Sequence, residues 1–107
     1  MPIIYKKFKC KLHRDVADTI RVAINDTLEH GVVETLDDKL LFAALAELTD
    51  ILYAKLGKGV MELSISLSPV QTLALCMFYH DYVNDYTSYA GNKLFALVNA
   101  IDKQMAV

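Results

Sequence analysis

Cysteine is scarce in this sequence, and so are long apolar runs. Cys10 and Cys76 are the only two cysteines in 107 residues, and two thiols do not make the disulfide framework of a small secreted domain. The longest uninterrupted apolar runs, residues 40–46 and 73–79, are much shorter than the roughly 18 residues that a membrane-spanning helix needs. The first residues also lack the apolar core and cleavage site of a signal peptide. We therefore expect a cytoplasmic protein that has no membrane partner.

Motifs that carry catalysis are missing as well. Only four glycines are present, and the Gly-Lys-Gly tripeptide at 57–59 lacks the pattern of a phosphate-binding loop. No nucleophile elbow or zinc-ligand spacing occurs, and both cysteines fall at apolar positions, where thiols are usually buried and unreactive. We interpret the polar residues of 80–85 as a solvated helix face, and those of 13–15 as turn and capping residues. These absences predict that the protein is not an enzyme and has no cofactor and no metal site. The alternative is a small enzyme, or an enzyme subunit whose site forms between chains.

Composition sets the size and the type of the fold. Hydrophobic residues make up 54% of the chain and charged residues 22%, a balance that is too apolar for a disordered segment. A chain of 107 residues can bury one good hydrophobic core but not two. We therefore predict a single domain over residues 1–107.

The net charge of −2 conceals an uneven distribution of charge along the chain. Residues 1–14 carry five basic side chains and no acid, whereas residues 15–57 carry nine acids and three bases. The basic segment is either a sheet edge protected by lysines or a local strip that binds nucleic-acid phosphates. The side chains of that strip would be Lys7, Lys9, Lys11 and Arg14. The acidic remainder would repel phosphate, which argues against a broad nucleic-acid surface.

Two segments alternate apolar and polar residues, as half-buried strands do. Within residues 3–12 the alternation sets Phe8, Cys10 and Leu12 against three lysines. Within residues 60–67 it sets four apolar side chains against serine and glutamate. A lone two-stranded unit is marginal in water. We therefore expect the two strands to pair antiparallel, with their apolar faces against helices and their lysine and serine faces exposed together.

Two helices are expected between these strands, because apolar residues recur there every three or four positions. The first covers residues 15–30 and has Asp15 as its predicted N-cap. The second opens at a capping box of Thr35 and Asp38 and ends at Gly57.

Two more helices are expected after the second strand. The third opens at a capping box of Ser68 and Gln71, has Pro69 at its first position, and runs to about Ser88. The fourth is expected to begin with Asn92 as its cap.

Together these elements predict a mostly helical α+β fold in the order β-α-α-β-α-α. Residues 1–57 and 58–107 would then be similar βαα half-units. An offset of 55 places the apolar strand positions of one half on those of the other, as a pseudo-twofold duplication of a βαα unit would. We favour a similar topology in both halves over a true duplication, since any two amphipathic helices can be aligned in apolar register and few matched positions hold the same residue.

A strand–helix–helix unit that pairs through its strand resembles the layout of the ribbon–helix–helix DNA-binding proteins. The resemblance covers the order of the elements and the alternation of the strands, not a sequence motif. It implies strands that enter the major groove of DNA, with Lys7, Lys9 and Lys11 facing the duplex. This chain departs from that pattern because its second strand has no Lys or Arg and places Glu62 on the same face.

Tyrosines are concentrated toward the end of the predicted third helix. Four of the six step by three, four and three residues, as one helical stripe would. They are Tyr79, Tyr82, Tyr86 and Tyr89. The stripe is either core or contact surface, since tyrosine offers a large contact area at low entropic cost. Residues 73–79 are apolar all round, which adds support to a contact surface, although a central helix with neighbours on every side could also bury this segment.

The leading functional prediction is therefore a non-catalytic protein-interaction or self-association module, a small accessory or assembly protein. Its partner would be another protein or a second copy in a homo-oligomer, contacted through the tyrosine stripe of the third helix. The alternative is a DNA-binding regulatory protein that uses the basic β-ribbon.

Overall fold

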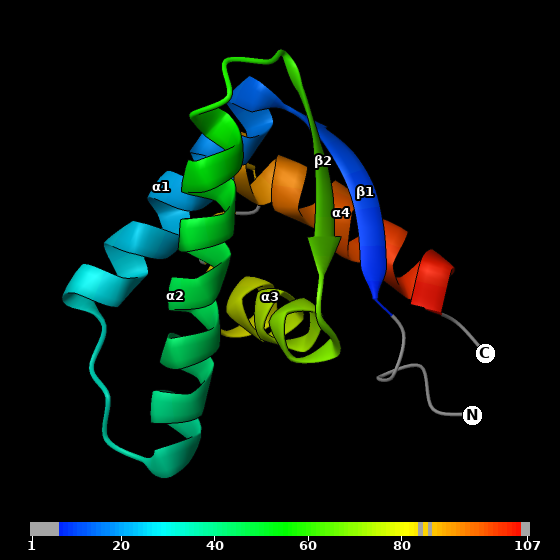
Figure 1. The fold of residues 1–107 in the computed structure, drawn as a ribbon. Helices are drawn as coiled ribbons and strands as arrows, with labels where there is room; N and C mark the ends of the chain where they lie inside the picture. Colours follow the sequence, from blue (N-terminus) through cyan, green and yellow to red (C-terminus); the bar gives the residue numbers. More distant parts are fainter. Residues whose placement is uncertain (1–6, 84, 86, 106–107) are drawn as a thin grey trace.

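The computed structural model describes residues 7–83, 85 and 87–105, and these form the six predicted elements in the predicted order (Figure 1). The strands are β1 (Phe8–His13) and β2 (Glu62–Leu67). The prediction of a mostly helical α+β fold is confirmed. The helices are α1 (Arg14–His30), α2 (Leu36–Leu56), α3 (Pro69–Tyr82) and α4 (Tyr89–Met105).

The two strands pair antiparallel, as predicted. Their register pairs Phe8 with Leu67 and Leu12 with Leu63, which places apolar side chains together on one face. That face packs into the core, whereas Lys9 on the other face is exposed. Because strand side chains alternate between faces, the sheet serves as one wall of the core and keeps its lysines and serines in water.

The four helices pack around the inner face of the sheet. In Figure 1, α4 crosses behind both strands, and it contacts β1. Helix α1 packs against α2 and α4, and α3 packs against the same two helices. Exchanging the half-units 1–57 and 58–107 leaves this pattern of helix contacts unchanged. The two halves therefore share one topology, while their duplication stays a prediction.

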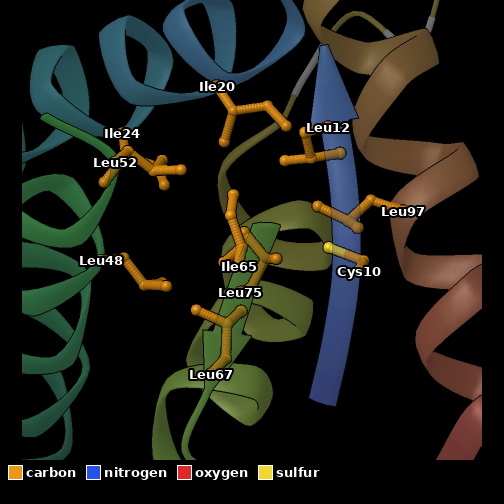
Figure 2. A pocket seen from close by; sticks show the side chains of 10 residues that line it. All are labelled: Cys10, Leu12, Ile20, Ile24, Leu48, Leu52, Ile65, Leu67, Leu75 and Leu97. Carbon is orange, nitrogen blue, oxygen red and sulfur yellow. The ribbon is translucent and has the colours of Figure 1, made fainter. Parts of the chain in front are cut away.

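All six elements contribute to the centre of the core, which Figure 2 shows from close by. A cavity of about 20 Å³ remains between these side chains. A water molecule would find no hydrogen-bond partner among them, so the cavity is a packing void and not a ligand site. Its lining consists of Cys10, Leu12, Ile20, Ile24, Leu48, Leu52, Ile65, Leu67, Leu75 and Leu97.

Two helix starts follow the predicted capping boxes. The N–H of Asp38 donates to the Thr35 hydroxyl over 3.1 Å, and the Thr35 N–H donates back to the Asp38 carboxylate over 3.2 Å. Ser68 and Gln71 make the same reciprocal pair at the start of α3. The N–H groups of Glu34 and Thr35 stabilise the Asp38 carboxylate, which lowers the pKa of that group. Local sequence therefore fixes where α2 and α3 begin.

The predicted end of the third helix is wrong. Helix α3 ends at Tyr82, with Val83 in an extended conformation, and does not continue to Ser88. Local polar bonds replace the helical ones there. The Asp85 carboxylate accepts hydrogen bonds from the N–H and the hydroxyl of Thr87, over 2.9 and 2.6 Å. Such side-chain bonds compete with helix formation, which explains the early end.

Two predicted N-caps also need correction. The hydroxyl of Ser88, not Asn92, caps α4 by accepting the N–H of Gly91 over 3.0 Å. Helix α1 is capped by His13, whose Nδ1 accepts the N–H of Asp15 over 3.2 Å. In both cases a side chain that precedes the predicted cap accepts a hydrogen bond from an N–H of the first turn, and the helix begins earlier than predicted.

Two glycines give a matched test of this packing. A Cβ at Gly31 would lie 2.6 Å from both the Phe42 ring and the Thr27 carbonyl oxygen, whereas a Cβ at Gly57 would have no neighbour closer than 3.5 Å. We expect Gly31→Ala to lower the free energy of unfolding by about 1–3 kcal/mol through overpacking. Gly57→Ala should instead raise it by roughly 0.4–1 kcal/mol, because Gly57 already has helical angles. Urea denaturation of both variants measures this, and equal effects would contradict the packing described.

Candidate functional site

Several of the large apolar side chains that the fold leaves in water lie on α2 and α3. Leu36 is 80% exposed and Leu40 is 65% exposed on α2. On α3, Val70 is 55% exposed, and Leu73 and Met77 are each 46% exposed. Scattered apolar residues are normal on a protein surface, but a contiguous apolar patch marks an interaction site.

Four of these side chains, all except Leu36, line a surface hollow that we name the α2–α3 groove. The residues that line it recur at the same spacing on both helices, namely i, i+3, i+4 and i+7. That spacing keeps four residues on one helical face, so each helix presents one continuous ridge. The lining residues are Asp37, Leu40, Leu41 and Ala44 of α2, with Val70, Leu73, Ala74 and Met77 of α3.

The depth of the groove comes from small residues on its floor. Ala44 and Ala74 are buried between the helices, together with Leu41, while longer side chains stand on the rims. A hydrogen bond from Gln71 Nε2 to Glu47 Oε1, at 2.9 Å, ties α3 to α2 beside the groove. Asp37 is the one charged residue in the lining. The α2–α3 groove is therefore nearly apolar and extends over about two helical turns, a shape that is suited to packing against another helix.

The tyrosines of the sequence prediction do not form one stripe. Tyr79 and Tyr82 lie on α3 and Tyr89 begins α4, so the helix that would have aligned them does not exist. Tyr79 stacks on Phe95, and Tyr82 contacts Phe42 edge to face. Tyr86 lies outside the described residues.

The described tyrosines of this set contact different partners. The ring centroids of Tyr82 and Phe78 lie 6.3 Å apart in a stacked arrangement, and Tyr82 is only partly buried. The exposed ring of Tyr89 carries Lys93 Nζ at 5.4 Å from its centroid. An interface role for Tyr79, Tyr82 and Tyr89 stays a prediction, but it no longer rests on a shared helical face.

Two of the predicted basic residues share a surface. Lys9 and Lys11 are exposed on the outer face of the sheet, paired with Ser66 and Ser64, and Lys55 of α2 borders the same shallow hollow. Lys7 is exposed just before β1. Arg14 departs from this group, because its guanidinium donates to the Val60 carbonyl over 3.4 Å. The strip is thus built from lysines of β1 and α2.

The described residues contain little that could do chemistry. Burial raises the pKa of the Cys10 thiol, and burial together with the charge of Asp102 raises the pKa of the Cys76 thiol. Thiolates are the reactive form, so both cysteines are poor nucleophiles. Over the described part of the chain, no three His, Cys, Asp or Glu side chains come together as metal ligands. Nor does any helix in this part have the length and apolar character needed to cross a membrane.

The α2–α3 groove was not predicted as a site. A partial signal was present, since residues 73–79 are apolar all round and one helix cannot bury every side against this small core. The apolar residues on the α2 side give no such signal, because in the sequence Leu36 and Leu40 look like ordinary apolar positions of an amphipathic helix. Which of their sides would face water depends on where α3 packs.

Comparison of the chain with protein-family models, with curated proteins and with solved structures finds no match.

Cysteine reactivity tests the assignment of both thiols as structural. We expect iodoacetamide at pH 7.5 to alkylate the folded protein at least about tenfold more slowly than the unfolded chain, because raised thiol pKa values and partial burial both reduce accessible thiolate. Mass spectrometry of timed samples gives the rate at Cys10 and at Cys76 separately. Alkylation of either residue in the folded protein as fast as in the unfolded chain would show that this thiol is reactive and contradict its structural assignment.

Proposed function

We propose that this protein is a non-catalytic interaction module that self-associates through the α2–α3 groove. The observation that supports this proposal is the apolar row on each side of the groove. Within the described chain, no element covers its four exposed apolar side chains, which are Leu40, Val70, Leu73 and Met77. Fully burying a leucine or methionine side chain contributes roughly 1.5–3 kcal/mol. Covering this surface therefore offers enough free energy to hold a partner.

A second copy is the partner that this surface suits best. In a twofold interface the same patch contacts itself, so it must carry both a projecting and a receiving part. The α2–α3 groove has both. Leu40 projects from α2, and the alanine floor beside it gives room for a side chain. An amphipathic helix of another protein would use the same rows and is the other form of the proposal.

A role as a small accessory or assembly protein in the cytoplasm follows from the same proposal. Such a protein acts by holding a partner and needs no reactive group. Cys10 and Cys76 are both free thiols, which suits a reducing compartment.

One substitution in the groove tests self-association directly. We expect the wild-type protein to sediment as a dimer at micromolar concentration, and Leu40→Glu to weaken the dimer at least about tenfold, because a carboxylate would be desolvated in an apolar interface. Val22→Glu is the matched control, since Val22 is 51% exposed on α1 and does not border the groove. Circular dichroism confirms that each variant is folded.

Analytical ultracentrifugation across a concentration series reports the result. A wild-type protein that stays monomeric at the highest concentration rejects self-association. In that case binding of an amphipathic helix from another protein, lost in Leu40→Glu and kept in Val22→Glu, would identify the other form of the proposal.

A nucleic-acid role of the β-ribbon is the second candidate function. The observation that favours it is the position of Lys55, which adds a third positive charge to the exposed face that carries Lys9 and Lys11. On this view the lysines contact phosphates and Ser64 and Ser66 face the duplex. Glu62 lies opposite His13 at the end of the same sheet and limits the length of the strip.

Salt dependence tests this second candidate. We expect duplex binding, if the strip provides it, to weaken steeply as salt rises from 50 to 200 mM, and Lys9→Ala with Lys11→Ala to abolish it. Lys39→Ala, on the exposed surface of α2 away from the strip, is the control. Absence of any mobility shift with duplex DNA at low salt would rule out the nucleic-acid role.

A further inference from the structure

The outer edge of β1 is a second surface whose shape and charge point to a partner. The N–H of Arg14 donates to the Met61 carbonyl over 2.8 Å, which continues the ladder toward β2. In an antiparallel pair, alternate residues turn their backbone groups to opposite sides. Lys9 and Lys11 therefore direct their N–H and C=O groups away from β2, along the free edge of the sheet.

At Lys9 the side-chain amide of Gln104 already occupies this edge. The Lys9 N–H donates to Gln104 Oε1 over 3.0 Å, and Gln104 Nε2 donates to the Lys9 carbonyl over 3.0 Å. A neighbouring strand would make the same two hydrogen bonds with its peptide groups. The Gln104 side chain thus takes the place of one residue of a third strand.

One step along the edge, the backbone of Lys11 has no such partner. None of the described residues supplies a hydrogen bond to its outward N–H and C=O groups. Beside them runs a groove between β1 and α4. In Figure 1, helix α4 passes behind the strand and emerges beyond it. Exposed Ala96 and Ala100 of α4 form part of the groove, and their small side chains leave room beside the strand.

Charge decides what kind of strand fits this edge. Side chains that lie opposite each other on neighbouring strands stabilise the pair when their charges are opposite and destabilise it when they are alike. Lys7, Lys9 and Lys11 all follow one face of β1, and Lys93 of α4 borders the groove. A second copy of β1 would place lysine beside lysine, so this edge disfavours the self-pairing of strands.

We propose that the outer edge of β1 binds an extended segment of another protein with acidic side chains at alternate positions. The segment adds a third strand to the sheet and displaces Gln104 from Lys9. The peptide groups of the segment form hydrogen bonds with the backbone of Lys9 and Lys11. Its acidic side chains lie beside the lysines, and its small apolar side chains face Ala96 and Ala100. This site uses different residues from the α2–α3 groove and does not depend on self-association.

A blocked peptide of alternating glutamate and valine, five residues long and labelled with a fluorophore, is the probe. We expect it to bind the wild-type protein in a fluorescence anisotropy titration, and a lysine–valine peptide to bind at least about tenfold more weakly because of like-charge pairing. Two further glutamate–valine peptides are N-methylated on alternate amides, one on the glutamates and the other on the valines. Only the form whose methyl groups replace the N–H groups that bond to β1 should fail to bind. Equal binding of both N-methylated forms would show charge attraction without strand addition and would overturn the proposal.

Three variants locate the site. Lys11→Glu should weaken the glutamate–valine peptide at least about tenfold, whereas Lys39→Glu on α2 should leave it unchanged. Gln104→Ala removes the competing amide and should strengthen binding about threefold or more. An unchanged affinity in Gln104→Ala, or no binding of the peptide at millimolar concentration, would overturn the proposal.

Two further readouts separate this site from the proposed functions. Leu40→Glu should keep peptide binding, because the α2–α3 groove lies elsewhere, and its loss would contradict the separation of the two surfaces. Duplex DNA that binds and is lost in Lys11→Glu, while the peptide does not bind, would support the nucleic-acid candidate and reject strand addition.

Discussion

The pairing of β1 with β2 is the constraint on which the rest of the structure depends. Residues 14–61 separate the two strands in the chain, and the register of the pair brings Phe8 to Leu67 and Leu12 to Leu63. A two-stranded sheet is not stable alone in water, so its apolar face must be covered. Helices from both halves meet over that face, and all six elements share one core (Figure 2). The described elements of both halves therefore contribute to one shared core.

A small sheet also limits what the helices can bury. Its inner face offers few side chains, and α3 uses Leu75 and Phe78 to reach the core while Leu73 and Met77 remain on the outside. The α2–α3 groove is thus a consequence of four helices sharing a small common core. The free edge of β1 has the same origin, because two strands leave both outer edges without a neighbouring strand. Both candidate surfaces follow from the size of the sheet.

The elements that sequence predicts well are those set by local chemistry. The alternation around Cys10 and Ile65 identifies the strands, and the capping boxes at Thr35 and Ser68 identify two helix starts. Prediction fails where a local bond competes with a helix, as at Asp85. It fails again where exposure depends on packing across the molecule, as at Leu40. The tyrosine stripe was a consequence of the first error, since it assumed a helix that continues past Tyr82.

The proposed self-association requires that a second copy of the chain covers the apolar rows of α2 and α3. Methyl NMR of protein labelled at methionine reports on this contact, since Met77 lies in the groove and Met61, also exposed, lies outside it. As concentration rises, Met77 should become protected from a soluble paramagnetic agent while Met61 stays accessible. A Met77 methyl that remains as accessible as Met61 at every concentration would rule out this interface.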